Sequence, residues 1–144
     1  MTVPSDPDPP TADRPAAVAP QPAIRVILLP KDTNALGTIF GGVILSYIDQ
    51  AGAVEAHRHC AGNLVTVAMR EVVFHAPVHV GDLVSFWTST TRIGTTSVTV
   101  HVEVEAERGH PGGPKAKVTE AEVVFVHVGP DGKPLPIAGC PPSA

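Results

Sequence analysis

Cysteine is scarce in this chain of 144 residues, which carries only Cys60 and Cys140. Small secreted domains that depend on disulfides carry cysteines at a higher density. Two cysteines that lie far apart, one on a predicted helix and one in a terminal segment, are no disulfide framework. We therefore expect Cys60 to be a packed thiol at a helix end, and we expect the protein in a reducing compartment, the cytoplasm.

Long apolar runs and an excess of positive charge are also missing. No apolar run approaches the roughly 18–20 residues that a membrane-spanning helix needs, so we expect no membrane insertion. The first ten residues, MTVPSDPDPP, show neither the basic nor the apolar segment of a secretory signal peptide. The formal net charge of −4 argues against non-specific binding of nucleic acid, which needs a basic surface.

Proline is concentrated at the two ends of the chain. Residues 1–22 hold seven of the 16 prolines, and the C-terminal PLPIAGCPPSA is also rich in proline. Proline lacks a backbone donor and these segments have little apolar bulk, which predicts extended, flexible tails over residues 1–22 and 134–144. Residues 23–133 remain as one folded unit, a length typical of a single domain.

Apolar residues recur at intervals of three and four after residue 42, which predicts a helix with a wide apolar face. They are Val43, Ile44, Tyr47, Ile48, Ala51 and Val54. We expect the helix to run for about 18 residues and to end near Gly62, a natural C-terminal cap. A short strand over residues 23–29 and a turn-rich loop precede it.

After the helix the period changes to two, which predicts strands over residues 64–78, 82–93, 96–107 and 116–128. The segments VGD, IGT and RGHPGGP supply turns between strands. One helix and one sheet can bury each other only if the sheet curls around the helix. The predicted fold class is therefore α+β, with one long central helix wrapped by a curled antiparallel sheet.

One acidic residue, Asp49, interrupts the apolar pattern of the helix. No basic residue stands one turn away, and the small residues at 51–53 leave space beside the carboxylate. An acid on a helix is most commonly a surface residue, but in apolar surroundings it can act as a base toward bound water. Asp49 is therefore the first candidate catalytic residue.

Two adjacent glycines, Gly41 and Gly42, stand where this helix begins. Glycine lets the backbone approach a ligand, and the first amides of a helix have no partner within it. Such an N-terminus stabilises developing negative charge, as in an oxyanion hole. Two glycines alone are weak evidence, but with an acid two turns along the helix they suggest acyl transfer.

Four stretches together resemble the hotdog-fold acyl-CoA thioesterases, most of all the YciA-type and brain-type acyl-CoA hydrolases. They are PKDTNALGTIFGGVILSYIDQAGAVEA, LVTVAMREVVFHAPVHVGDLV, RIGTTSVTVHVEV and KVTEAEVVFVHV, and the match covers about residues 25–133. The resemblance implies a hotdog fold, a dimer with a continuous sheet, and assembly of dimers into a hexamer or a tetramer. It implies hydrolysis of acyl-CoA to a free carboxylic acid and coenzyme A.

The resemblance also implies roles for single residues. Asp49 matches the family's helix aspartate, a general base or a nucleophile, and the sequence does not choose between the two. Asn34 matches the loop asparagine that completes each site together with the aspartate of the partner subunit. Gly41 and Gly42 match the glycines whose amides polarise the thioester carbonyl. Thr38 departs from the pattern, because the family often has an acidic or other polar residue there.

Coenzyme A is expected to bind at a turn and at cations. Residues 94–97 match the family's turn near the pantetheine and the nucleotide; they are Gly94, Thr95, Thr96 and Ser97. The phosphates need positive charge, for which Arg92, Lys115 and Lys117 are the candidates, although each is as readily a solvated surface charge. Coenzyme A is part of the substrate, so no separate cofactor is expected.

Other chemistries find little support in the sequence. His57 and His59 point apart on a helix, and His57 with Cys60 supplies only two ligands, so we expect no metal site. Neither a nucleophile elbow nor a Walker-type phosphate loop is present. A hydratase or dehydratase on this fold would commonly use a histidine, which the loop before the helix lacks. A non-catalytic module that binds acyl-CoA stays open, and the preferred acyl length is not predicted.

Overall fold

The computed structural model describes residues 2 and 19–141 of the chain. Most of the proline-rich segment predicted as a tail over residues 1–22 lies outside the described residues. The elements are β1 (Ile24–Ile27), a 3-10 turn (Pro30–Asp32), α1 (Gly41–Ala56), β2 (Asn63–Arg70), β3 (Leu83–Ile93), β4 (Ser97–Glu107) and β5 (Lys115–Val128).

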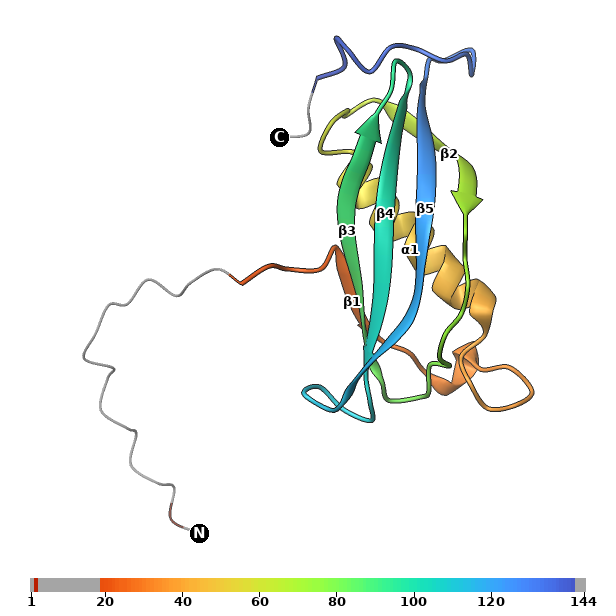
Figure 1. Ribbon diagram of the computed structural model, residues 1–144, viewed down its shortest axis with the longest axis vertical. Coiled ribbons are helices and arrows are strands. Elements are labelled where there is room, and N and C mark those ends of the chain that lie inside the picture. Colours follow the sequence, from red (N-terminus) through yellow and green to blue (C-terminus); the bar gives the residue numbers. More distant parts are fainter. Residues whose placement is uncertain (1, 3–18, 142–144) are drawn as a thin grey trace.

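All five strands form one antiparallel sheet in the order β1-β3-β4-β5-β2 (Figure 1). The helix α1 crosses one face of this sheet, and the chain then passes over the sheet so that β2 pairs with β5 at the far edge. The predicted α+β architecture, a central helix with a curled antiparallel sheet, is confirmed. Within the described residues, none of the helices has the length and apolar character needed to cross a membrane.

The core lies between α1 and the face of the sheet that it covers. Alternate residues of β4 are fully buried, as the period of two predicts, and they meet the buried face of the helix. Gly52 of α1 is buried at this contact, where an added Cβ would lie 3.0 Å from Cζ of Phe125 on β5. The small residues Ala51 and Gly52 thus serve close packing of helix on sheet, and not an open space beside Asp49 as the sequence suggested.

Two predicted boundaries were wrong. The helix ends at Ala56 and is capped by His57, so Gly62 is no helix cap. Strand β2 ends at Arg70, because Glu71 adopts a φ of 57° that breaks the extended backbone. The following segment is a loop tied to its surroundings by single hydrogen bonds, such as the amide of His75 donating to the carbonyl of Val118.

The C-terminal segment differs most from the expectation of a flexible tail. Over residues 134–141 it packs along one end of the sheet, where the Ile137 side chain is only 7% exposed and its amide donates to the carbonyl of Thr95 at 2.8 Å. A disulfide joins Cys60, just beyond α1, to Cys140. The prediction of a lone packed thiol at Cys60 was therefore wrong, because the fold brings two distant cysteines together.

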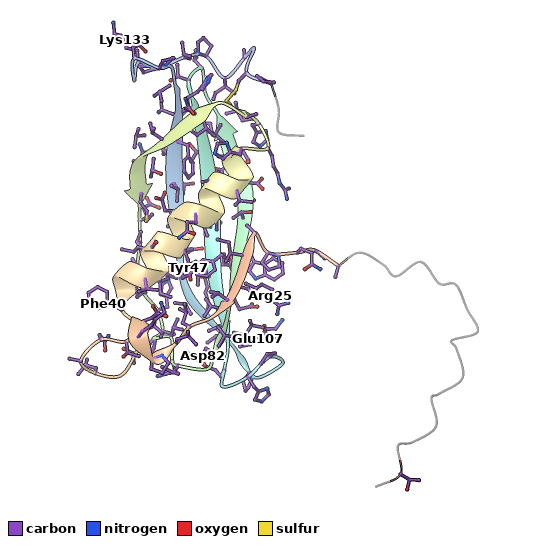
Figure 2. The ribbon with its side chains drawn as sticks, turned by 180° about the vertical axis from the view of Figure 1, so that it is seen from behind. Arg25, Phe40, Tyr47, Asp82, Glu107 and Lys133 are labelled. Atoms are coloured by element: carbon purple, nitrogen blue, oxygen red, sulfur yellow. A yellow bond between two sulfur atoms is a disulfide. The ribbon has the colours of Figure 1, made fainter. Side chains whose placement is uncertain are left out.

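A buried carboxylate clamps the opposite end of the sheet. Asp82 is 1% exposed and accepts hydrogen bonds from the amides of His79 and Gly109, both at 2.9 Å, and from Nη1 of Arg108 at 2.7 Å. Burial alone would raise the pKa of Asp82, but these three donors together hold it below its usual value. The clamp joins the loop before β3 to the loop after β4; Figure 2 labels Asp82 there.

Loss of the Cys60–Cys140 crosslink should lower stability. We expect Cys140→Ser to reduce the free energy of unfolding by about 2–4 kcal/mol under oxidising, metal-free conditions, because the unfolded chain regains the freedom of a long loop. Guanidinium titration with and without a reductant measures the effect. The variant should be indifferent to reductant, and an equal response of variant and wild type would contradict the assignment.

Neutralising the clamp should also destabilise the fold. We expect Asp82→Asn to lower the free energy of unfolding by about 2–3 kcal/mol, because the amide group of asparagine replaces a carboxylate that accepts hydrogen bonds from buried donors. Folding lowers the pKa of Asp82. Its contribution to the free energy of unfolding is therefore complete above the pKa of the unfolded chain, near 3.8, and is lost as the pH falls through the pKa of the folded protein. Urea titrations at a series of acidic pH values should therefore show that the free energy of unfolding falls less with pH in this variant than in wild type. Asp131→Asn, a change of an exposed acid, is the control.

Candidate active site

The N-terminus of α1 presents free backbone donors. Phe40 is the N-cap residue and gives no side-chain cap, and within the described residues no hydrogen bond uses the amides of Gly41 or Gly42. The amide of Phe40 itself is held by the carbonyl of Asp32 at 2.8 Å, which fixes where the helix begins. Two unpaired N–H groups on a fixed backbone are what an oxyanion needs.

Cavities adjoin both glycines. One of about 380 Å³ runs along the outer side of the first helical turns; it is lined by Asp32, Phe40, Gly42, Val43, Ser46, Tyr47 and Gln50. Figure 2 shows Phe40 and Tyr47 along this stretch of α1. Another, of about 260 Å³ and mostly apolar, reaches from Gly41 to the loop after β2 and includes Phe74 and Val118. The helix start therefore borders open space on two sides.

Asp49 lies in the middle of α1 and faces the edge strand β2. The hydroxyl of Thr66 donates to its Oδ1 at 2.6 Å, and the carboxylate is half-buried. Ser46 and Gln50, on the same part of the helix, are exposed. The single chain therefore fixes the direction of the acid but does not enclose it, contrary to the burial expected from the sequence.

Thr66 is a part of this site that sequence reasoning missed. It belongs to a strand with a register irregularity between Thr66 and Ala68, where Val67 has no paired residue on β5. A threonine in a strand is unremarkable by composition, and its link to Asp49 depends on the placement of β2 beside the helix. Only the three-dimensional fold could identify it.

Asn34 is held within its own loop. Its Nδ2 donates to the hydroxyl of Thr38 at 2.9 Å, and its Oδ1 accepts from the amides of Leu36 at 2.9 Å and Thr38 at 3.3 Å. The described residues show no hydrogen bond between Asn34 and Asp49. Thr38, where the chain departs from the family pattern, thus supports Asn34.

The predicted turn for coenzyme A lies at the other end of the molecule. Residues Gly94–Ser97 join β3 to β4, and the amide of Gly94 donates to the carbonyl of Ser97 at 2.8 Å. The carbonyl of Thr95 accepts a hydrogen bond from the amide of Ile137, and the carbonyl of Thr96 accepts one from the amide of His127. This turn adjoins the C-terminal segment, whereas α1, whose first residue is Gly41, begins at the opposite end of the molecule (Figure 1).

The three candidate cations do not gather in one chain. Arg92 is exposed near the turn, whereas Lys115 begins β5 and pairs in register with Glu107 at the far end of β4. Lys117 donates to Glu120 at 3.0 Å, and this bond raises its pKa. Along β4, the residue opposite Arg92 (Thr99) and the residue opposite Lys117 (Glu105) are about 20 Å apart, and Lys115 lies farther away still, so Arg92 does not share a phosphate with either lysine of the same chain.

The edge strand β2 leaves one side unpaired and apolar. It bonds only to β5 within the described chain, and Val65 and Val67 are exposed on it. Leu36, on the loop that holds Asn34, is 89% exposed. Unpaired strand edges and exposed apolar side chains of this kind mark surfaces for association.

A single helix in the concave face of an antiparallel sheet is the hotdog fold. The chain belongs to the thioesterase superfamily, whose family model it matches over residues 36–112.

Known proteins agree with this assignment. Acyl-CoA thioester hydrolase YciA of Salmonella typhimurium is 40% identical over 79% of this chain and 87% of its own, and that of Escherichia coli K12 is 41% identical over 79% and 89%. Among solved structures, the hexameric hotdog-fold thioesterase Cj0915 of Campylobacter jejuni has a TM-score of 0.75 and 42% identity, covering 81% of this chain and 90% of its own.

Proposed function

We propose that this protein is an acyl-CoA thioesterase, which hydrolyses an acyl-CoA to a free carboxylic acid and coenzyme A in the cytoplasm. The observation that carries the proposal is that the chain presents both of the groups the reaction needs, the free amides of Gly41 and Gly42 and the carboxylate of Asp49, whose direction Thr66 fixes. The names of the curated relatives support the substrate class.

The proposed chemistry needs one acid and one set of donors. Asp49 as general base takes a proton from water while the water oxygen attacks the thioester carbon, and the Gly41 and Gly42 amides stabilise the resulting oxyanion. The carbon–sulfur bond then breaks and the coenzyme A thiolate takes up a proton. In the alternative route, the Asp49 carboxylate attacks first and forms a mixed anhydride that water hydrolyses.

The spacing along α1 argues that each site is shared by two chains. Asp49 stands eight residues beyond Gly41, which is about 12 Å along a helix. An attacking water in contact with a carbonyl carbon lies about 3 Å from it, as do the oxyanion donors, so one chain's acid cannot serve its own amides. We infer a dimer in which Asn34, Gly41 and Gly42 of one chain meet Asp49 of the other.

The apolar edge of β2 is the proposed place of contact. Pairing of two β2 edges would extend the sheet across the dimer and cover Val65 and Val67. Five of the solved neighbours are described as hexameric, including Cj0915 and a thioesterase of Yersinia pestis, which supports assembly beyond the dimer.

Coenzyme A is proposed to reach Arg92 and the Gly94–Ser97 turn. An acyl-CoA hydrolase of Staphylococcus aureus, 26% identical with a TM-score of 0.71, was solved with butyryl coenzyme A and coenzyme A, which supports this ligand class. Because Arg92 lies far from Gly41 in one chain, the turn would come from another subunit. Lys115 and Lys117 lie away from both the turn and the helix start, and each already pairs with a carboxylate of its own sheet, so they could contact coenzyme A only if it reached that part of the sheet as well.

Removal of the acid tests the chemistry. We expect Asp49→Asn to lower the rate of thiol release from a panel of short to long acyl-CoAs by about 10²–10⁴-fold, because an amide cannot accept the proton of water. Asp131→Asn, the same change on an exposed acid, should leave the rate unchanged. If wild type binds acyl-CoA and releases no thiol from any of them, the protein is a binding module and the proposal fails.

Mixed dimers test the shared site. Co-expressed Asn34→Ala and Asp49→Asn chains should regain about a quarter of wild-type activity, because half the dimers are mixed and each mixed dimer has one intact site. Each variant expressed alone should remain impaired. A mixture no more active than the variants alone would mean that both residues act within one chain.

A further inference from the structure

The residues around the Cys60–Cys140 bond form a group that the thioesterase chemistry does not use. The sulfur atoms of both cysteines and a ring nitrogen of His127 all lie within 4.8 Å of one another. Cys60 follows α1 and is fully buried, His127 is near the end of β5, and Cys140 belongs to the C-terminal segment. Three separate parts of the chain therefore converge on one point.

The imidazole of His127 is oriented toward the sulfurs. Its Nδ1 lies 3.0 Å from the carbonyl oxygen of Pro136, a contact in which Nδ1 must carry the proton and donate. Nε2 then holds a free lone pair, and it faces Gly62, where an added Cβ would collide with Nε2 and lie 3.3 Å from Sγ of Cys140. A backbone carbonyl that fixes the second nitrogen is the usual support of a metal-binding histidine.

We propose that, when the disulfide is reduced, Cys60, Cys140 and His127 bind one zinc-class divalent ion, with water as the fourth ligand. In a tetrahedral site with Zn–S near 2.3 Å, two thiolate sulfurs lie about 3.8 Å apart, so the two bonded sulfurs separate when the ion replaces the disulfide, while all three ligand atoms start within 4.8 Å of one another. Two thiolates and one neutral imidazole are the ligands that Zn²⁺ prefers.

Replacement of the disulfide by the ion requires a two-electron reductant, for which a phosphine serves in the experiment. The phosphine and one water convert the disulfide to two thiols and a phosphine oxide, and Zn²⁺ then displaces the two thiol protons. The ion would keep the C-terminal segment fastened to the helix end where no disulfide persists, as in a reducing compartment. The two crosslinks are thus alternatives at one place.

A zinc titration tests the proposal. Untagged full-length protein is reduced with phosphine, stripped with a chelator and desalted without oxygen, then titrated with Zn²⁺ against a chromophoric chelator. We expect one ion per chain, release of protons, no uptake by the oxidised protein, and a thiolate-to-cobalt charge-transfer absorption when Co²⁺ replaces zinc. Binding of less than one ion, of one ion per two chains, or absence of that absorption overturns it.

Matched histidine variants locate the ion. His127→Ala should weaken zinc binding by about 100-fold or more, because removal of a metal ligand lowers the affinity further than removal of a residue that only supports a ligand. The variant should still close the disulfide on oxidation, which shows that it folds. His101→Ala removes a histidine from the His101, Glu103 and Glu120 group on the sheet and should keep wild-type affinity. Equal affinity of His127→Ala and wild type would refute the site.

Discussion

The contact between α1 and the sheet is the constraint on which the rest of the molecule depends. Gly52 brings the helix so close to Phe125 that a single methyl group would have to displace the ring. This approach fixes the height of the helix above the sheet and turns Asp49 toward β2. The acid, its Thr66 partner and the glycine amides are therefore placed by packing that has no chemical role itself.

The two ends of the sheet are held in place by two different kinds of interaction. A carboxylate surrounded by donors holds the loops at the end near the start of β3, and a covalent bond to the C-terminal segment holds the other. Arg25 adds a further tie near the first end, where it meets Glu107 at 2.8 Å (Figure 2). With its ends fixed, the curled sheet keeps the shape that accommodates the helix.

The sequence was sufficient for the type and order of the elements, which depend on local period, but not for the ends of α1 and β2. The helix, the alternating strands and the isolated Asp49 follow from spacing, and the confirmed fold follows from them. What it could not show depends on contacts between distant residues: the crossing of β2 to the far edge, the pairing of Cys60 with Cys140, the docking of Ile137, and the separation of Arg92 from Lys115. Small residues at 51–53 were assigned to the site because their packing partner, Phe125, stands 73 positions away from Gly52.

The irregular pairing in β2 makes the hydrogen bond between Thr66 and Asp49 depend on the length of the strand. Side chains of a strand alternate between faces, and the unpaired Val67 shifts that alternation directly after Thr66. A change of residue type in β2 leaves the alternation as it is. An insertion or deletion of one residue that shifts Thr66 against Phe125 would instead turn its hydroxyl to the opposite face and leave Asp49 without its partner, so this hydrogen bond depends on the length of the strand as well as on the residue at position 66.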